Sequence, residues 1–271
     1  FKICIFEPSR RAWICIFYKI KNNSWSIFGL ADIEGIKVID YALRDRGLYY
    51  SEKYSIPIIK NNSKAPYLML GGTTKICYKT NSLENSFNKG KFKTRISNYQ
   101  SESLIKKAIG FSENTQQTIL DITGGLGHDA FIMALLGEKV TLVEKNVGLC
   151  ILIEEALENL PSEAYFSKAK SNITVINSDS RELVQKANQF DVIFVDPMFN
   201  SQKKLKRTKQ MEFLDMYLEE YDDPSIDFYE TEFRRMVLKK ELRSLSGIKD
   251  DPAISFKGTS IRFDVYFRGK I

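Results

Sequence analysis

Three acidic residues stand where apolar runs of this chain end. Glu144, Asp179 and Asp196 each come at or just after the last residue of a run rich in Val and Ile. If these runs are parallel strands, their carboxyl ends meet at one edge of a sheet, which is where open α/β sheets bind ligands. The two oxygens of Glu144 suit the two hydroxyls of a ribose, and Asp179 or Ser180 can meet the edge of a base. The acids therefore predict a nucleotide-binding site.

A glycine-rich turn accompanies the acids. The segment ILDITGGLGHDAF (119–131) is an apolar strand that turns into a helix beginning near His128. Gly125 and Gly127 allow backbone angles closed to other residues and let a ligand lie against the main chain. The first N–H groups of the helix favour a carboxylate or a phosphate. Together with Ala130, the glycines also fit the G-x-G-x-x-A fingerprint of dinucleotide enzymes, so an NAD-dependent dehydrogenase is one interpretation.

The tetrapeptide Asp196-Pro197-Met198-Phe199 favours a methyltransferase instead. An enzyme that methylates an amine must hold that amine beside the methyl group of S-adenosylmethionine. Either the Asp196 carboxylate or the Pro197 carbonyl can accept the hydrogen bond of the amine. Phe199 can stack on a base that has left its own stack. We therefore expect Asp196, Pro197 and Phe199 to be the catalytic residues.

The elements that must position these residues alternate between strand and helix. The predicted strands are 118–122, 139–143, 173–176 and 190–195, and the predicted helices are 101–109, 128–136 and 146–160. Asn146 can cap the last of these helices, and Gly137 ends the second. Apolar and polar residues alternate over 261–267, which predicts a late strand with one face more deeply buried. The pattern predicts a doubly wound, Rossmann-like α/β sheet.

The chain divides near residue 95. Residues 1–95 are predicted to form a small α+β domain with a basic linker, and 96–271 to form the sheet domain that holds the site. The short β-like runs of the first part are 2–6, 13–18, 25–30, 67–70 and 75–78. Its polar end, 81–98, carries interspersed Lys and Phe residues and is either a linker or an RNA-facing strap, with composition favouring the linker.

Composition limits the class of protein. The 271 residues include 40 Lys and Arg against 34 Asp and Glu, a net charge of +6 that permits an anionic partner. The 4 cysteines form no C-x-x-C pair, so we expect no metal site and a reducing, cytoplasmic location. No apolar run approaches the roughly 18 residues of a membrane span. The oligomeric state is left open by the sequence.

A basic run follows the tetrapeptide closely. A stacking aromatic beside a cluster of cations suits an RNA-modifying site, because phosphate contacts position the strand while the pocket recognises the base. We expect five residues to contact RNA: Lys203, Lys204, Lys206, Arg207 and Lys209.

Four segments carry a family resemblance. ILDITGGLGHDAF, TLVEKN, VDPMF with the basic run after it, and FKGTSIRFDVYF together resemble the ribosomal RNA small subunit methyltransferase J family. The resemblance implies a class I methyltransferase fold, mostly parallel with a late antiparallel strand. It also implies methylation of N2 of a guanine by S-adenosylmethionine, in small-subunit (16S) ribosomal RNA or an assembling small subunit. The implied cofactor contacts are His128, Asp129, Glu144, Lys145, Asp179, Ser180 and Asp196.

The chain also departs from this family. His128, its single histidine, stands where the family usually has Arg, and Lys239-Lys240-Glu241 stands in place of Lys-Arg-Pro. The stretch from Arg95 to Glu102 lacks the family's glycines. These departures keep a non-catalytic RNA-binding assembly factor with a relic pocket as an alternative. A methyltransferase of another nucleobase amine, such as adenine N6, is a further alternative with the same site chemistry.

Overall fold

The chain forms two compact units, Phe1–Leu30 and Ala31–Ile271. The computed structural model describes residues 3–7, 12–16, 32–197, 209–218, 223–245 and 247–269. In the first unit, β1 (Ile3–Glu7) pairs antiparallel with β2 (Ala12–Ile16), as a hairpin with Ile3 opposite Ile16. This pairing confirms the strands predicted at 2–6 and 13–18, within two residues at each end. The run predicted at 25–30 lies outside the described residues.

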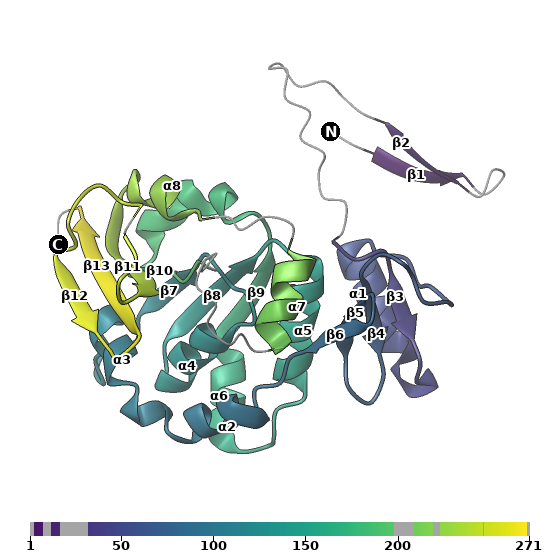
Figure 1. The fold of residues 1–271 in the computed structure, drawn as a ribbon, viewed down its shortest axis with the longest axis horizontal. Coiled ribbons are helices and arrows are strands. Elements are labelled where there is room, and N and C mark those ends of the chain that lie inside the picture. The colour runs from purple at the N-terminus through teal and green to yellow at the C-terminus, as the bar shows by residue number, and fades with distance from the viewer. Residues whose placement is uncertain are drawn as a thin grey trace. The chain divides into compact units, whose positions relative to one another are not determined.

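A seven-stranded sheet forms the centre of the second unit, in the order β12-β13-β11-β10-β7-β8-β9 (Figure 1). The strands are β7 (Thr118–Asp121), β8 (Lys139–Glu144), β9 (Ile173–Asn177), β10 (Val192–Val195), β11 (Phe233–Glu241), β12 (Ile254–Lys257) and β13 (Ile261–Arg268). The five strands from β11 to β9 are parallel, and β13 runs antiparallel to both of its neighbours. The predicted doubly wound sheet with a late antiparallel strand is confirmed.

Helices cover both faces of this sheet (Figure 1). They are α3 (Ser103–Ile109), α4 (His128–Leu136), α5 (Val147–Glu158), α6 (Ala164–Ser171), α7 (Lys209–Tyr217) and α8 (Ser225–Tyr229), with 3-10 segments at Tyr99–Ser101 and Ser180–Gln189. As predicted, Gly137 ends α4 in the left-handed region at φ 106°. The Asn146 side chain caps α5 by accepting from the Leu149 N–H. No helix among the described residues has the length and apolar character needed to span a membrane.

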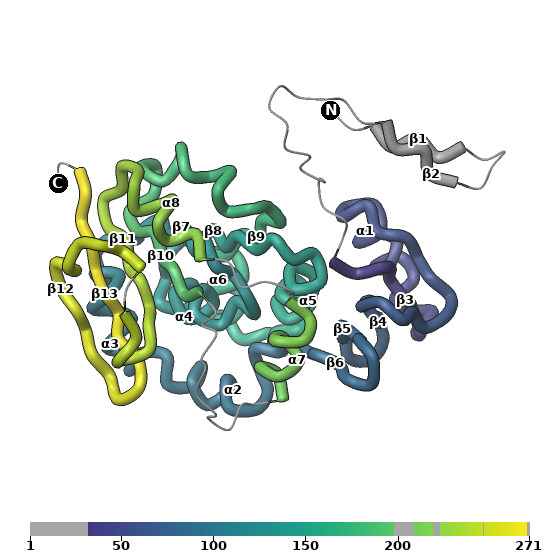
Figure 2. Tube along the Cα trace, turned by 45° about the horizontal axis from the view of Figure 1, so that its top comes forward, coloured from purple at the N-terminus to yellow at the C-terminus, as the bar shows by residue number. Residues whose placement is uncertain are grey.

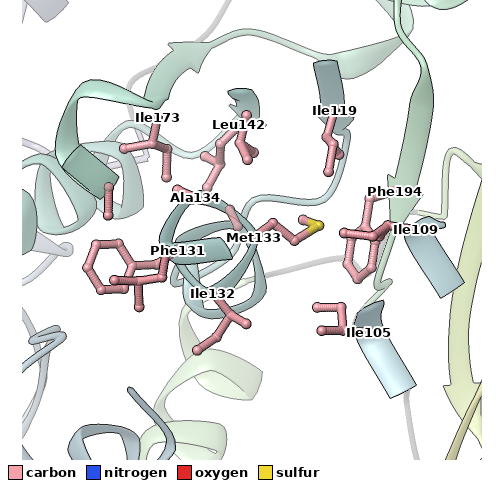
Figure 3. Packing of buried hydrophobic residues seen from close by; sticks show 14 of the residues in the cluster. Ile105, Ile109, Ile119, Phe131, Ile132, Met133, Ala134, Leu142, Ile173 and Phe194 are labelled. Carbon is pink, nitrogen blue, oxygen red and sulfur yellow. The ribbon is translucent and has the colours of Figure 1, made fainter. Parts of the chain in front are cut away.

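Alternating residues of each central strand pack into two separate cores. Ile119 and Phe194 face one core with α3, α4 and α6, while Leu120 and Ile193 face the other with α8. Figure 3 shows the first core, in which Phe131 of α4 is fully buried. Its ring stacks on Phe87 with centroids 4.2 Å apart and planes 5° apart. Two apolar faces are what a sheet with helices on both sides requires, and they explain the continuous Val and Ile runs.

The last strand differs from its prediction. The alternation over 261–267 predicted one deeply buried face, but both faces of β13 are covered at its centre. Asp264 is buried at 1% exposure because Arg262 and Ser255 both donate to its carboxylate. On the same face, Tyr266 packs edge-on against the ring of Tyr229 from α8. Asp264, a polar position of the alternating run, is therefore buried because its carboxylate is hydrogen-bonded.

A second, four-stranded sheet precedes the large one, with α1 (Arg44–Tyr54) against it. Its strands are β3 (Ile36–Val38), β4 (Tyr67–Leu70), β5 (Lys75–Tyr78) and β6 (Asn81–Glu84). β4 and β5 have the predicted bounds. The polar stretch 81–98 is not a linker, because it forms β6 and the helix α2 (Gly90–Ser97), which Figure 2 shows beneath α4 and α6. Phe87 and Ile96 fix this stretch, since both are buried in the core of the large sheet.

The small sheet shares a core with α5 and α7. Ile33, Leu68 and Ile76 belong to the same buried cluster as residues of these two helices. At its edge, the half-buried Asp32 carboxylate accepts from the N–H groups of Val147 and Gly148 at the start of α5. Tyr217 of α7 donates to Asp32 and lies 2.7 Å from the Asn146 side-chain oxygen. The domain boundary predicted near residue 95 lies inside the second unit, Ala31–Ile271, and it stays a prediction.

We predict that Tyr217→Phe destabilises the fold. The variant removes a hydrogen bond to a half-buried carboxylate, and a hydrogen bond to a charged group contributes about 1.5–3 kcal/mol. Tyr41→Phe is the matched control, because Tyr41 is 81% exposed and its loss falls within about 0.5 kcal/mol. Urea unfolding followed by circular dichroism measures both. Equal midpoints for the two variants would contradict the structural role of the Tyr217 hydroxyl.

Candidate functional site

A cavity lies at the carboxyl edge of the large sheet, where β7, β8, β9 and β10 end. It is lined by seven of the residues that the sequence nominated: Gly125, Glu144, Lys145, Asp179, Ser180, Asp196 and Pro197. Apolar side chains, including Ile122, Val143 and Leu149, line the same cavity. A mixture of apolar walls and a few polar groups is typical of a small-molecule site.

The glycine turn forms one wall of the cavity. A Cβ atom at Gly124 would lie 2.6 Å from Leu142 Cδ2 and 2.9 Å from the Val143 carbonyl, so only glycine lets the turn approach β8 this closely. Gly125 has φ 53°, in the left-handed region that favours glycine. The Asp196 N–H donates to Thr123 Oγ1 at 2.7 Å, which ties the end of β10 to this turn.

Glu144 is held in the cavity by main-chain donors. Its two oxygens accept from the N–H groups of Gly125 at 2.7 Å and Asn146 at 2.8 Å. Burial raises the pKa of Glu144 to about 7, against the opposing effect of these two hydrogen bonds. Since a carboxylate has about four acceptor positions, two remain for the hydroxyls of a ligand. The fixed backbone donors orient these positions before a ligand arrives.

Asp179 and Ser180 lie on the cavity wall formed after β9. Asp179 caps the 3-10 segment that follows by accepting from the Arg181 N–H at 2.9 Å. Arg181 is itself paired with Asp227 at 2.7 Å. Asp179 therefore serves as a helix cap as well as a lining residue, and its second oxygen lies 3.5 Å from the Arg181 guanidinium.

Three nominated residues do not line this cavity. Gly127 is the N-cap residue of α4, and its carbonyl accepts from the Phe131 N–H at 2.9 Å. His128 stacks on Phe92 of α2 with centroids 4.2 Å apart. Burial lowers the pKa of His128 to about 4, so the ring is neutral at pH 7 and has no cationic role there. Asp129 is buried and takes part in an ionic network.

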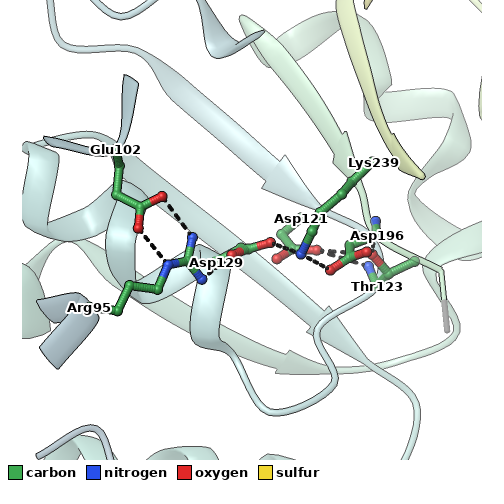
Figure 4. A network of polar contacts seen from close by, with 7 residues as sticks. All are labelled: Arg95, Glu102, Asp121, Thr123, Asp129, Asp196 and Lys239. Atoms are coloured by element: carbon green, nitrogen blue, oxygen red, sulfur yellow. Dashed lines mark hydrogen bonds and ion pairs between the residues drawn. The ribbon is translucent and has the colours of Figure 1, made fainter. Parts of the chain in front are cut away.

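This network links α2 to the end of β10 (Figure 4). Arg95 of α2 lies 2.6 Å from Asp129 Oδ1 and 2.7 Å from Glu102. Lys239 of β11 lies 2.6 Å from both Asp129 Oδ2 and Asp196 Oδ2. The Lys239 ammonium thus bridges the carboxylates of Asp129 and Asp196, and the Arg95 guanidinium binds the other oxygen of Asp129.

The charges of the network oppose the effect of burial. Burial favours the neutral form of Asp129, but Lys239 and Arg95 outweigh it and hold the pKa of Asp129 below its ordinary value. Burial raises the pKa of Asp196, and Lys239 acts in the opposite direction. The carboxylate of Asp121, at the end of β7, accepts hydrogen bonds only from Thr123 among the described residues. Its pKa is raised to about 7 by burial.

Sequence reasoning missed the roles of Arg95 and Lys239. Lys239 was noted only in a segment that departs from a family pattern, and Arg95 was noted there and as one of the basic residues of the polar stretch 81–98. Lys239 stands opposite Asp196 because β11 lies parallel to β10 with Leu238 beside Val195. Its place near the carboxyl end of a strand was the one available signal, since ligand-binding residues gather at that edge.

Several nominated residues lie outside the described part of the chain. They are Phe199 and the basic residues Lys203, Lys204, Lys206 and Arg207. Lys209, the last of the basic run, is described: it begins α7 and is exposed.

An open α/β sheet with acids at its carboxyl edge is an arrangement that suits a nucleoside ligand, and similarity to known proteins defines the class. The family model described as "Putative SAM-dependent methyltransferase" matches residues 59–268. The chain belongs to this family of S-adenosylmethionine-dependent methyltransferases, and the dehydrogenase interpretation is thereby wrong.

Named relatives agree with this assignment, and one solved structure shares the fold. "Ribosomal RNA small subunit methyltransferase J" of Francisella tularensis subsp. novicida is 30% identical over 199 residues, which cover 71% of this chain and 83% of that protein. The protein of the same name from Acinetobacter baylyi is 32% identical over 172 residues, 57% of this chain and 64% of that protein. The crystal structure of an S-adenosylmethionine-dependent methyltransferase from Neisseria gonorrhoeae has a TM-score of 0.65 at 20% identity, covering 86% of this chain and 96% of that one. The last likeness supports the fold.

S-adenosylmethionine is the cofactor, and the cavity has donors and acceptors that fit it. When bound, it supplies a methyl group on a positively charged sulfonium. Glu144 offers acceptor positions for ribose hydroxyls, and Ile122, Val143 and Leu149 offer apolar contacts for a base. The carboxylates at this edge favour a cationic ligand, because a nearby positive charge stabilises their ionised form.

We predict that His128 titrates far below an ordinary histidine. As it is the single histidine of the chain, its proton NMR signal reports one site, with a midpoint near 4 in place of 6.5. Because the folded pKa is lowered, His128 contributes stability above pH 6.5 that is lost as the pH falls toward 4. Phe92→Ala opens the ring to water and raises the midpoint toward 6.5. Phe267→Ala, at a 40% exposed side chain on β13, leaves it unchanged. A wild-type midpoint near 6.5 would show that the ring is hydrated.

Proposed function

We propose that this methyltransferase transfers its methyl group to the exocyclic N2 amine of a guanine in small-subunit (16S) ribosomal RNA. The observation that carries the proposal is Asp196-Pro197 at the end of β10, in the wall of the cofactor cavity, with the ammonium of Lys239 2.6 Å from the Asp196 carboxylate. A carboxylate at this position can accept a hydrogen bond from the amine that receives the methyl group. The names of the Francisella and Acinetobacter relatives support small-subunit ribosomal RNA as the substrate. We expect the enzyme to act in the cytoplasm, on naked RNA or an assembling small subunit.

Asp196 is proposed to orient the amine by accepting one of its hydrogen bonds. This contact turns the nitrogen lone pair toward the methyl carbon. Bound S-adenosylmethionine would supply the methyl group and be left as S-adenosylhomocysteine, and one N–H proton of the amine would pass to water at the cavity. Catalysis of this kind is mainly positioning and electrostatic stabilisation, since the donor is already activated. Pro197 offers its carbonyl as a second acceptor, and Phe199 is proposed to stack on the base.

The cofactor contacts remain proposals of the same kind. We assign the ribose hydroxyls to Glu144, the adenine edge to Asp179 or Ser180, and the main-chain approach to Gly125, while Lys145 also lies on the cavity wall. For Gly127, His128 and Asp129, which lie outside this wall, the contribution is indirect. Gly127 shapes the start of α4, His128 packs α2 against it, and Asp129 holds Lys239.

We predict that the chain labels guanine N2. Incubation of unmodified small-subunit ribosomal RNA with S-adenosylmethionine carrying a labelled methyl group, followed by digestion to nucleosides, should give N2-methylguanosine. Asp196→Asn loses the carboxylate acceptor and should lower kcat by about 100-fold, the range seen for loss of one positioned catalytic group. Asp191→Asn, on a carboxylate that pairs with Arg234 before β10, is the matched control and should retain activity.

The alternatives give different outcomes in the same experiment. Label in N6-methyladenosine would move the substrate to adenine and retain the site chemistry. No label in any nucleoside, with RNA binding intact, would favour the assembly factor with a relic pocket. Calorimetry with S-adenosylmethionine then tells whether the cavity still binds the cofactor.

We further predict that the basic run binds the RNA backbone. Replacing Lys203, Lys204, Lys206 and Arg207 by Gln should weaken RNA binding and flatten its salt dependence by about 0.7 in log–log slope for each single-strand phosphate that is no longer neutralised. Lys89, Lys91 and Lys93, exposed around the start of α2, provide a control set of the same charge type. Fluorescence anisotropy over a range of salt concentrations measures the slope. If the α2 set changes the slope and the basic run does not, the RNA docks along α2 instead.

A further inference from the structure

A partly buried lysine stands between two carboxylates at the edge of the cofactor cavity. The Lys239 ammonium lies 2.6 Å from Oδ2 of Asp129 and 2.6 Å from Oδ2 of Asp196, and its side chain is 20% exposed. Distances of this length are typical of charge-assisted hydrogen bonds. The two carboxylates therefore share the Lys239 ammonium. Its effect on Asp196 depends on the strength of its interaction with Asp129.

Asp129 is fixed from its other side. Arg95 donates to Asp129 Oδ1 at 2.6 Å, and its remaining nitrogens donate to the two oxygens of Glu102 at 2.7 and 3.1 Å. Asp129 lies in the first turn of α4 and is buried at 6% exposure. Since the carboxylate is held at both oxygens, it fixes the ammonium in place and keeps it directed at Asp196 (Figure 4).

The two oxygens of Asp196 have different surroundings. Oδ2 accepts from Lys239, whereas Oδ1 has no donor among the described residues. The Asp196 side chain is 33% exposed, so this second oxygen belongs to a group that solvent or a ligand can reach. A carboxylate anchored at one oxygen presents the other in a defined direction, which is what an acceptor for a substrate amine requires.

We propose that Lys239 is a positioning residue for methyl transfer: it holds Asp196 ionised and anchored at Oδ2, so that Oδ1 accepts the hydrogen bond of the substrate amine. Asp129, which is paired with Arg95, competes with Asp196 for the Lys239 ammonium. It therefore sets how strongly Lys239 binds Asp196. The inference rests on the proposed role of Asp196 as the amine acceptor. It assigns a role to Lys239, Asp129 and Arg95 that does not require any of them to touch the cofactor.

Two variants should shift the pKa of Asp196 in opposite directions: Lys239→Met should raise it, and Asp129→Asn should lower it. Lys239→Met leaves Asp196 near Asp129 without the shared cation, so Asp196 takes up its proton at higher pH. The acidic limb of the kcat profile should rise by about one pH unit or more. Asp129→Asn removes the competitor and a like charge, so the same limb should fall. Lys239→Arg restores a cation and should return the limb toward the wild-type position.

The experiment measures three quantities on the full chain. The first is kcat against pH with ribosomal RNA, and the second is the affinity for S-adenosylmethionine by calorimetry. The third is the carboxyl carbon NMR titration of Asp196, assigned by its loss in Asp196→Asn. Arg234→Met is the control, because Arg234 lies on the same strand at 68% side-chain exposure and pairs with Asp191. It should change none of the three.

Each outcome has a definite meaning. An upward shift of the Asp196 titration in Lys239→Met, a downward shift in Asp129→Asn and unchanged cofactor affinity support the proposal. A tenfold or greater loss of cofactor affinity with an unmoved titration overturns it and makes Lys239 a cofactor ligand. If Lys239→Met fails to fold, Asp129→Asn still decides, because an unmoved or raised titration there overturns the proposal. If the wild type methylates no RNA, the proposed function fails, while the NMR titration still tests the hold of Lys239 on Asp196.

Discussion

Carboxylates gathered at one buried sheet edge are the constraint on which this site depends. Asp121, Asp129, Asp196 and Glu144 all lie at or beside the carboxyl ends of β7, β8 and β10, because parallel strands bring their ends together. Burying an unpaired carboxylate costs several kcal/mol, and like charges add to this cost. Each acid must therefore be neutralised, hydrogen-bonded or protonated. The fold stabilises each of these carboxylates with different partners, and these partners determine how the site is arranged.

The cofactor side and the proposed amine side of the cavity use different means. Glu144 is satisfied by two main-chain N–H groups, which belong to the glycine turn and the start of α5. These donors are set by the backbone and are insensitive to which side chains surround them. Asp196 depends on the Lys239 ammonium, which a side chain elsewhere can strengthen or weaken. The cofactor side is thus built into the fold, while the amine side is adjusted by an ionic network that reaches α2.

This difference also explains what could be predicted from the sequence. The strands, the glycine turn, Glu144 and Asp196 follow from local patterns: apolar runs, glycines and the acids after them. Lys239 lies 110 residues from Asp129 along the chain, and no local pattern links the two. The strand β6 and the helix α2 were missed because they are mostly polar, and few residues, among them Leu83 and Ile96, fix them in the cores. Residues whose role comes from a distant partner need the register of β10 and β11, which a sequence pattern does not contain.

The same network accounts for the departure at position 128. The resemblance to the methyltransferase J family leads one to expect an arginine there, and His128 at a pKa near 4 cannot replace its charge at neutral pH. The positive charge beside Asp129 comes instead from Arg95 and Lys239, each 2.6 Å from one of its oxygens. Both oxygens of Asp129 are thus paired with a cation. The neutral ring of His128, which stacks on Phe92, therefore leaves this carboxylate with its charge compensated. The stack also packs α2 against α4, which keeps Arg95 within reach of Asp129. His128 therefore supports the charge of the site through packing, and its change from arginine is no evidence that the site has lost its chemistry.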